Sequence, residues 1–449
     1  MEAKSTGEGL KRVIGVPGLA ATIVNGIVGA GIYVLPAVVS MRMGASGILG
    51  YLFCGVMLIA IMLCYMEIGS KVNASGGSYI YVEKAFGPFA GFVANWLYSF
   101  GWGILGSAAL MNVIADSLAA LFPVFSNPFM RALLYFVLLG AMVWVNVRGA
   151  KQSVRVLEYI TVIKLIPLFG IIIFGFSQVK MSNLSWQHWP HLNTLGETVL
   201  VLFFAFAGFE TALGASGEIK NPKRTIPFGV MLGAAIVFLF YVLIQTVTQG
   251  VLGPTMGTFK NAPLAAVAQN IVGPAGATIL LVAAMISCLG NVGGDVLNTP
   301  RLLFAGANDG LFPRFLGKVH QRFATPYLAV VTYAGLIFLF SVSGGFKELA
   351  VLASGALLLI YLSVILATVR LKTKKGQAAE KTFKVPGGLL IPLIGIAAIV
   401  WLLSHLSAKE ILSTIVFILI ICMIYFLMKI FQKKKVTINT ASPIQPAKE

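Results

Sequence analysis

The chain has 449 residues, of which 58% are hydrophobic and only 11% are charged, and its mean hydropathy is +0.90. Soluble domains carry about 25% charged residues, so this composition excludes an ordinary soluble protein and predicts several membrane-spanning helices. The net charge of +18 would point to a nucleic-acid partner in a soluble protein, but the positions of the cations described below favour a different explanation.

The sequence holds no Walker motif, no nucleophile elbow and no His-Glu-x-x-His pattern. Its four histidines are scattered, and its four cysteines all lie in apolar runs. We therefore expect no enzyme activity, no metal site, no cofactor and no structural disulfide.

The first apolar run, residues 13–40, contains Gly26, Gly29 and Gly31 within six residues. Each glycine costs a helix about 1 kcal/mol relative to alanine, and backbone groups released inside a membrane find no water. Such a break persists where it lines a cavity or meets a ligand. The alternative is that the glycines only allow tight helix packing.

A second run, residues 199–217, is interrupted in a similar way between Phe204 and Glu210. Two hydrophobic segments interrupted at corresponding positions of two halves indicate a transporter site. The free N–H groups of one half-helix suit a carboxylate, and the free carbonyls of another suit an ammonium group. An α-amino acid carries both groups, so these two runs favour an amino-acid transporter.

Hydropathy predicts twelve membrane-spanning helices. Their approximate limits are 13–40, 46–70, 88–121, 130–147, 154–177, 194–217, 227–252, 274–298, 326–343, 348–370, 388–405 and 410–431. Short helices are expected over 78–86 and 261–273, and a basic loop over 371–386.

Basic residues lie mainly on one side of the predicted membrane. With the N-terminus inside, 26 lysines and arginines fall on the inner side and 6 on the outer, while Lys164 lies within a span. The positive-inside rule then predicts a multi-pass protein of the cell membrane with both termini cytoplasmic. We expect these positive charges to contact the anionic headgroups of membrane lipids, and we expect no nucleic-acid partner.

The first ten spans form two sets of five, and each set opens with an interrupted span. Because five is odd, the second set enters the membrane from the opposite side, which predicts an inverted repeat. The expected units are a cytoplasmic segment (1–12), the first repeat (13–177), the second repeat (194–370), two further helices (388–431) and a basic, disordered cytoplasmic tail (432–449).

Three motifs resemble those of the amino acid–polyamine–organocation (APC) superfamily. They are Gly29-Ala30-Gly31-Ile32-Tyr33 with Pro36, Gly208-Phe209-Glu210 followed by the Asn-Pro-Lys-Arg loop at 221–224, and the segment from Arg301 through Ala307-Asn-Asp-Gly to Pro313. The resemblance covers roughly residues 10–430. The chain is similar to bacterial amino-acid permeases and exchangers related to the L-type and cationic amino acid transporters.

This resemblance implies an all-α membrane protein of the LeuT type, with twelve helices, a five-plus-five inverted repeat, broken first and sixth spans and two extra helices. It implies that backbone N–H groups at Ala30 and Gly31 bind the substrate carboxylate, and that carbonyls near Ile27, Phe204 and Ala207 face the amino group. Ala30 replaces the serine common in the family, but the main-chain donors remain. The full expected substrate-binding set is Ile27, Gly29, Ala30, Gly31, Gly101, Trp102, Phe204, Ala205, Ala207 and Asp295.

The resemblance also places Phe204 at an aromatic gate that Gly101 and Trp102 face, the alternative being ordinary core packing. Animal L-type members carry an extracellular cysteine that joins a heavy chain. The third-to-fourth loop here, residues 122–130, has none, so we expect no disulfide-linked heavy chain and a monomer or homodimer.

Lys164 is expected at membrane depth, where a charge is costly enough to suggest function. The resemblance implies that its ammonium replaces a sodium ion, near Ser287 or Asn291, and braces the broken first span against the eighth. It could also exchange a proton during transport, or it could snorkel to the membrane surface. Glu210, beside the second break, could stabilise the unwound segment, respond to protonation or simply bond orphan N–H groups.

Asp295 aligns with a substrate-facing position of the eighth span, and a carboxylate there would favour cationic side chains. The competing interpretation is that it pairs with Lys164. The sequence thus predicts a sodium-independent secondary transporter, an exchanger or proton-coupled, for cationic or broadly varied α-amino acids. The alternatives are a polyamine or amine exchanger, and a nutrient receptor or channel of the same fold.

Overall fold

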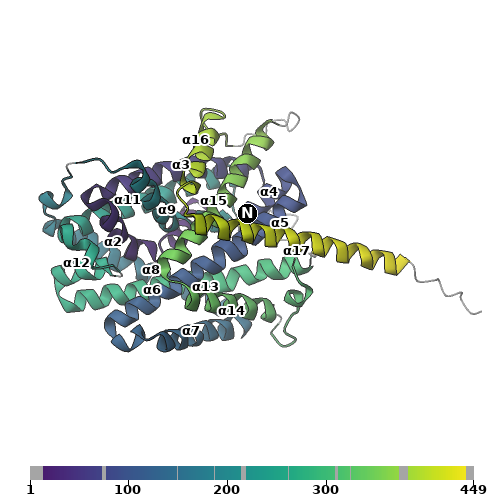
Figure 1. Cartoon of the computed structure of the whole chain (residues 1–449), viewed down its shortest axis with the longest axis horizontal. Helices are drawn as coiled ribbons and strands as arrows, with labels where there is room; N and C mark the ends of the chain where they lie inside the picture. The colour runs from purple at the N-terminus through teal and green to yellow at the C-terminus, as the bar shows by residue number, and fades with distance from the viewer. Residues whose placement is uncertain are drawn as a thin grey trace, which may run out of the picture.

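The computed structural model describes residues 14–72, 77–148, 150–186, 188–213, 219–260, 262–308, 312–323, 325–373 and 383–440. Over these residues the chain is all-helical (Figure 1), and the β-type pairing among them is an isolated bridge between Ile14 and Ile219. The α-helices before the second break are α1 (Val16–Ile27), α2 (Gly31–Met43), α3 (Gly47–Lys71), α4 (Ser78–Phe86), α5 (Pro88–Trp96), α6 (Leu105–Leu121), α7 (Pro128–Arg148), α8 (Ala150–Gly175) and α9 (Leu192–Phe206). Those after it are α10 (Phe209–Leu213), α11 (Pro222–Leu252), α12 (Pro263–Val272), α13 (Pro274–Asn308), α14 (Tyr327–Ser343), α15 (Phe346–Thr373), α16 (Leu390–Leu403) and α17 (Ala408–Thr440).

Proline marks where many of these helices begin. It occupies the first position of α5, α7, α11, α12 and α13, where its missing N–H would have had no helical partner and its fixed φ already suits the helix. Between α5 and α6 the chain stays helical but widens into a π-helical segment, η2 (Leu97–Ile104), and such segments are frequent at functional sites.

The structure interrupts both glycine-containing apolar runs. The first run is divided into α1 and α2 by residues 28–30, and the second into α9 and α10 by Ala207 and Gly208. α2 packs against α9, and α1 packs against α10. The two breaks therefore lie next to each other, although about 180 residues of sequence separate them.

Eight helical stretches among the described residues are long and apolar enough to cross a membrane. The other apolar helices, among them α1, α14, α16 and the part of α8 from Ile163, are shorter. Many large apolar side chains are exposed on the outer faces of α7, α8 and α17. Water would not favour such a surface, whereas lipid chains would, which accords with a multi-pass membrane protein.

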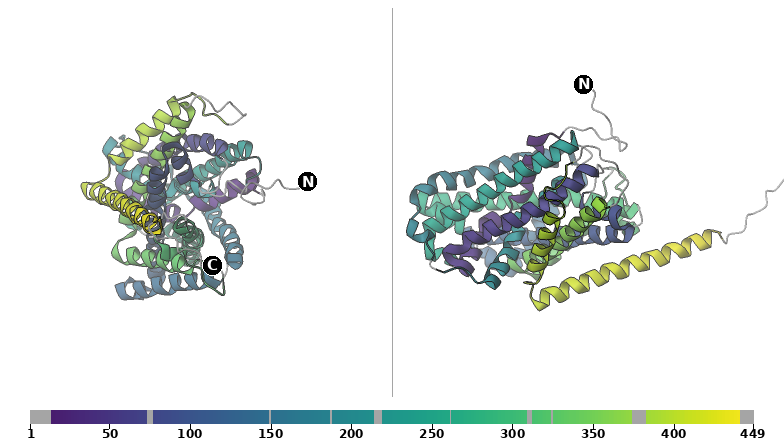
Figure 2. Two further views of the ribbon diagram at one scale, coloured as in Figure 1. Left: turned by 90° about the vertical axis from the view of Figure 1, so that its right-hand side faces the viewer. Right: turned by 90° about the horizontal axis from the view of Figure 1, so that it is seen from above.

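Two groups of helices enclose the centre of the molecule. One contains α1, α2, α3, α9 and α11, and the other contains α6, α7, α13 and α14, which occupy the lower part of Figure 1. α15 packs against members of both groups, and α16 covers α3 and α15. α17 packs at the edge of the bundle, mainly against α5 and α15, and then extends away from it (Figure 2).

The short helices α4 and α12 lie where the sequence places short helices, within two residues at each end. Three elements extend well beyond their expected limits: α11 begins at Pro222, α13 continues to Asn308, and α17 continues to Thr440, into the tail expected to be disordered from residue 432. The first thirteen residues, most of the basic loop and residues 441–449 lie outside the described part of the chain.

Candidate functional site

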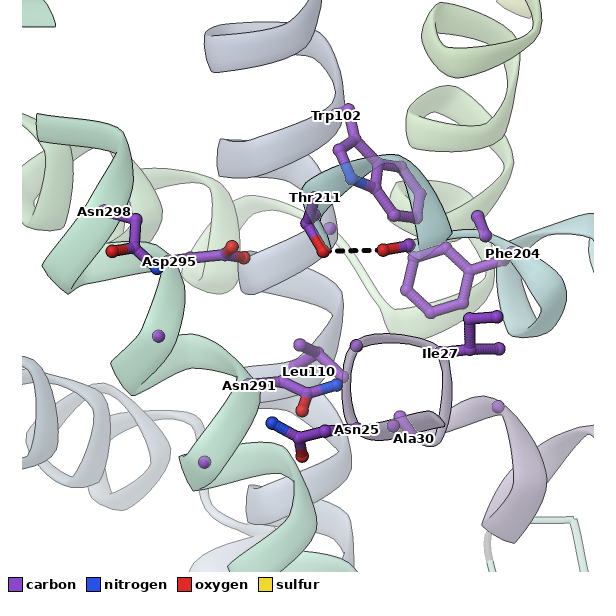
Figure 3. A pocket seen from close by; sticks show the side chains of 18 of the residues that line it. Asn25, Ile27, Ala30, Trp102, Leu110, Phe204, Thr211, Asn291, Asp295 and Asn298 are labelled. Carbon is purple, nitrogen blue, oxygen red and sulfur yellow. Dashed lines mark hydrogen bonds between the residues drawn. The ribbon is translucent and has the colours of Figure 1, made fainter. Parts of the chain in front are cut away.

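A cavity of about 220 Å³ lies between the two groups of helices, at the level of both breaks (Figure 3). Pockets for drug-sized ligands have volumes of roughly 300–1,000 Å³, so this one suits a smaller molecule. Its walls come from α1 and α2, from η2 and α6, from the second break, and from α13. The lining residues are Thr22, Asn25, Gly26, Ile27, Gly29, Ala30, Gly31, Trp102, Gly106, Leu110, Phe204, Ala207, Gly208, Thr211, Gly290, Asn291, Gly294, Asp295 and Asn298.

The cavity is open on one side and closed on the other. Three lining residues are exposed, namely Thr22 in α1, Thr211 in α10 and Asn298 in α13. Leu110 and Phe204, which line it elsewhere, are buried, with 6% and 7% of their surfaces exposed. Solvent therefore reaches the cavity from the end of the bundle at which α1 begins.

The first break places the start of a helix at the cavity. The opening N–H groups of a helix have no partner in a preceding turn, and α2 begins at Gly31 beside Gly29 and Ala30, all of which line the cavity. The positive end of the α2 dipole adds to the attraction for an anion. A carboxylate is one of the anionic groups that such an end suits.

The carbonyls of the same break are held by Lys164, whose side chain is completely buried. Its Nζ donates to the backbone oxygens of Asn25 and Val28, both at 2.8 Å, and to Asn291 Oδ1 at 3.4 Å. The Ser287 hydroxyl also donates to the Val28 oxygen, at 3.3 Å. The amine thus joins α8, the end of α1 and α13, and it does not snorkel to a membrane surface.

At the second break, Gly208 adopts a φ of +118° and lies against the first break. A Cβ added at Gly208 would approach the Gly26 oxygen to 2.7 Å. The Glu210 carboxylate accepts from the Gly208 N–H at 3.1 Å and from the Tyr361 hydroxyl, so it bonds a backbone group that the break releases. The Thr211 hydroxyl donates to the Gly208 oxygen at 2.6 Å, as the dashed line in Figure 3 shows.

This geometry makes a direct prediction for Gly208→Ala. The new methyl group would meet the Gly26 oxygen, and alanine disfavours a positive φ by about 1 kcal/mol or more. We expect a lower melting temperature for the purified protein. The control is Gly335→Ala in α14, where an added Cβ has nothing within 4 Å. Equal melting temperatures for the two variants would contradict the close approach of the breaks.

Two aromatic side chains form one wall of the cavity. The Trp102 and Phe204 rings lie 5.6 Å apart between centroids, and Phe204 also meets Phe346 of α15, at 5.7 Å. Figure 3 shows both residues beside the Thr211 segment. A bound molecule between them and the breaks would be covered by apolar rings on the closed side of the cavity.

Asp295 lies on the opposite wall, on α13. Its Oδ2 accepts a hydrogen bond from the Ser107 hydroxyl at 2.8 Å, and its side chain points from α13 toward the neighbouring helix (Figure 3). Lys164 and Asp295 are both described residues and form no ion pair, because the ammonium is occupied at the first break. The interpretation that Asp295 pairs with Lys164 is therefore wrong.

Two residues of the expected substrate set do not line the cavity. Gly101 lies on the side of η2 that packs against α15 and α17, where an added Cβ would meet Ala356 at 2.6 Å, whereas the next residue, Trp102, lines the cavity. Ala205 instead packs against Gly31. A Cβ added at Gly31 would lie 2.4 Å from the Ala205 methyl group. Both residues therefore lie behind the cavity wall and contact it without lining it.

Three polar residues at or beside the site, Ser107, Tyr241 and Asn298, were not predicted from the sequence. Asn291, Asp295 and Asn298 line the cavity at the i, i+4 and i+7 positions of α13, and this spacing could have identified Asn298. Ser107 and Tyr241 gave no such signal. The Tyr241 hydroxyl donates to the Ala205 oxygen at 2.9 Å and to the Ile27 oxygen at 3.4 Å, so it joins the ends of α9 and α1. Among the described residues, no group of three His, Cys, Asp or Glu side chains could hold a metal ion.

The chain is similar to known proteins over most of its length. Residues 14–444 match the family model described as amino acid permease. The chain is 26% identical to the serine/threonine exchanger SteT of Bacillus subtilis, over 90% of this chain and 93% of that protein. It is also 26% identical to the branched-chain amino acid permease BcaP of Bacillus subtilis, over 95% of each. It is 27% identical to the large neutral amino acids transporter small subunit 2 of Mus musculus, over 74% of this chain and 65% of that protein.

Proposed function

The chain belongs to the amino acid permease family, and on this basis we propose that it is a secondary active transporter that carries α-amino acids by alternating access. The observation that carries the proposal is the cavity between two helix breaks, one of which offers free N–H groups to a carboxylate. Its family and relatives are transporters and permeases, and none of its motifs suggests an enzyme.

In this proposal the substrate carboxylate binds the N–H groups of Ala30 and Gly31, next to Gly29. The ammonium group faces the carbonyl side of the second break, near Phe204 and Ala207. The Ile27 oxygen is a weaker candidate than the resemblance implied, because Tyr241 already donates to it. Phe204 and Trp102 would close over the substrate, and Glu210 would hold the unwound backbone in shape.

We further propose the complete LeuT-type architecture of twelve spans in two inverted repeats. The repeats would cover residues 13–177 and 194–370, with α16 and α17 appended. Support comes from the paired interruptions, which open the two sets of five, and from the packing of α1 on α10 and of α2 on α9. We expect a monomer or homodimer without a disulfide-linked heavy chain.

Orientation gives a prediction that does not depend on the substrate. The excess of lysine and arginine on one side predicts a cell-membrane protein with both termini in the cytoplasm, and with that orientation the cavity would open inward in the conformation described here. A fluorescent protein fused after Glu449 should therefore fluoresce. A dark fusion, together with an active periplasmic phosphatase fused at the same residue, would contradict this topology.

Two charged residues, Lys164 and Asp295, carry our proposals for ion coupling and for substrate specificity. Lys164 holds the carbonyls of the first break, where a sodium ion would otherwise be expected, so we propose sodium-independent exchange or proton coupling. The three relatives described above are named for neutral amino acids. The case for cationic or broadly varied substrates therefore rests on Asp295 alone.

The decisive experiment uses purified protein in liposomes with a panel of radiolabelled amino acids, with and without a pH gradient. We expect saturable uptake that depends on both the α-amino and the α-carboxyl group, and acceleration by amino acid inside the vesicles. Equal uptake of amines that lack a carboxylate would favour a polyamine exchanger. Uptake that does not saturate would favour a channel, and binding without uptake would favour a receptor.

A further inference from the structure

A second cavity, of about 270 Å³, lies between α3 and α11. Every residue that lines it is aliphatic, aromatic, methionine or glycine. At its mouth are Ile59, Met231 and Ala235, which are exposed, and at its floor are Ile27 and Phe206, which are buried. Water needs two to four polar partners to occupy a cavity, so water does not explain this one.

The cavity lies at membrane depth. α3 and α11 belong to two of the eight stretches that can cross a membrane. Met231 and Phe238 lie 9 and 16 residues from Pro222, the first residue of α11, which corresponds to about 14 and 24 Å along the helix. Half of a bilayer's hydrocarbon core is about 15 Å thick. A lipid chain from the leaflet at the start of α11 can therefore enter the cavity and reach the membrane midplane.

One exposed face of α11 connects the cationic side chain of Arg224 with the mouth of this second cavity. Arg224, Phe228, Met231 and Ala235 are all exposed, and their spacing of i, i+4, i+7 and i+11 places them on one face of the helix. The Arg224 guanidinium lies 5.9 Å from the Phe228 ring centroid. Lys220, also exposed, lies just before the helix. A cation at the membrane surface attracts an anionic headgroup.

We propose that this cavity holds one acyl chain of an anionic phospholipid from the leaflet in which Arg224 lies. The phosphate lies at Arg224, and the chain passes Phe228 and Met231 into the cavity. Ile27 lines both this cavity and the polar one, and Phe206 is the last residue of α9. The lipid chain therefore touches the last residue before each break, on the side opposite the polar cavity.

The test measures bound phosphatidylglycerol by native mass spectrometry on the whole protein in detergent. We expect one tightly held molecule in the wild type and its loss in Ala235→Trp, whose indole would fill the mouth. Arg224→Gln should weaken binding about fivefold, because one cation near an anionic surface contributes about that factor. Phosphatidylcholine should bind more weakly than phosphatidylglycerol by a similar factor.

α7 offers matched controls. Arg148 lies over the Trp144 ring at 4.0 Å, and Ala141 is exposed on the same face, but this face borders neither of the two cavities. Arg148→Gln and Ala141→Trp should keep the lipid. Equal losses in the α7 variants would overturn the proposal, because they would show general annular binding. Retention of the lipid by Ala235→Trp, or equal binding of both lipids, would also overturn it.

A readout on the wild type removes any dependence on the folding of a variant. Phosphatidylglycerol with a photoreactive diazirine in its acyl chain should label the α3 and α11 peptides that contain Met62 and Met231. Labelling of the α7 peptide to the same extent would overturn the proposal.

Discussion

Lys164→Ala is expected to lose most transport, by at least about tenfold, while the protein still folds. The ammonium bonds the Asn25 and Val28 oxygens at the first break, and the substitution leaves both carbonyls without this donor inside the membrane. Losing hydrogen bonds to a charged group costs about 1.5–3 kcal/mol, which is tenfold or more in an equilibrium constant. Initial uptake rates in liposomes give the measurement, across a range of pH.

The matched control is Lys180→Ala, because Lys180 follows α8 and is exposed. Wild-type uptake should be the same in choline and sodium buffers. Sodium should partly restore uptake by Lys164→Ala, a result that a purely structural lysine would not give. If Lys164→Ala transports like the wild type in choline buffer at every pH, the ammonium has no part in transport.

The positions of the breaks could be predicted from the sequence because each has a local chemical cause. Glycines at 26, 29 and 31 weaken the first helix, and Gly208 accepts a backbone conformation that other residues avoid. These features require no knowledge of distant neighbours. For a lone lysine in an apolar run, the sequence left two environments open, burial against oxygen atoms and the membrane surface, and the structure shows the first.

Side-chain directions could not be predicted, because they depend on contacts between distant helices. Gly101 faces α15 and α17 and not the site, and the local sequence does not show which side of η2 these two helices cover. Ser107 and Asp295 are 188 residues apart, so nothing local indicates their hydrogen bond. The same holds for Tyr241, which joins the ends of the two broken helices from α11.

The structure strengthens the case for Asp295 as a specificity residue. Its carboxylate is on the cavity wall, and among the described residues Ser107 is its one hydrogen-bond donor and no cation pairs with it. Asp295 is partly shielded from solvent, and a carboxylate removed from water is costly unless a cation pairs with it. The side chain of lysine, ornithine or arginine would supply that cation, and arginine could bond both oxygens at once.

Asp295→Ser is therefore expected to lose cationic amino acids and to keep or gain neutral ones such as leucine or alanine. The apparent affinity for arginine should fall roughly tenfold to a hundredfold, because a hydrogen bond to a charged group contributes about 1.5–3 kcal/mol. Asn298→Ser, one turn along the same wall of α13, changes no charge and should leave the ratio of arginine to leucine uptake unaltered. Competition against a radiolabelled substrate measures both. If the wild type carries only neutral amino acids, and arginine and lysine fail even to compete, Asp295 does not select the substrate.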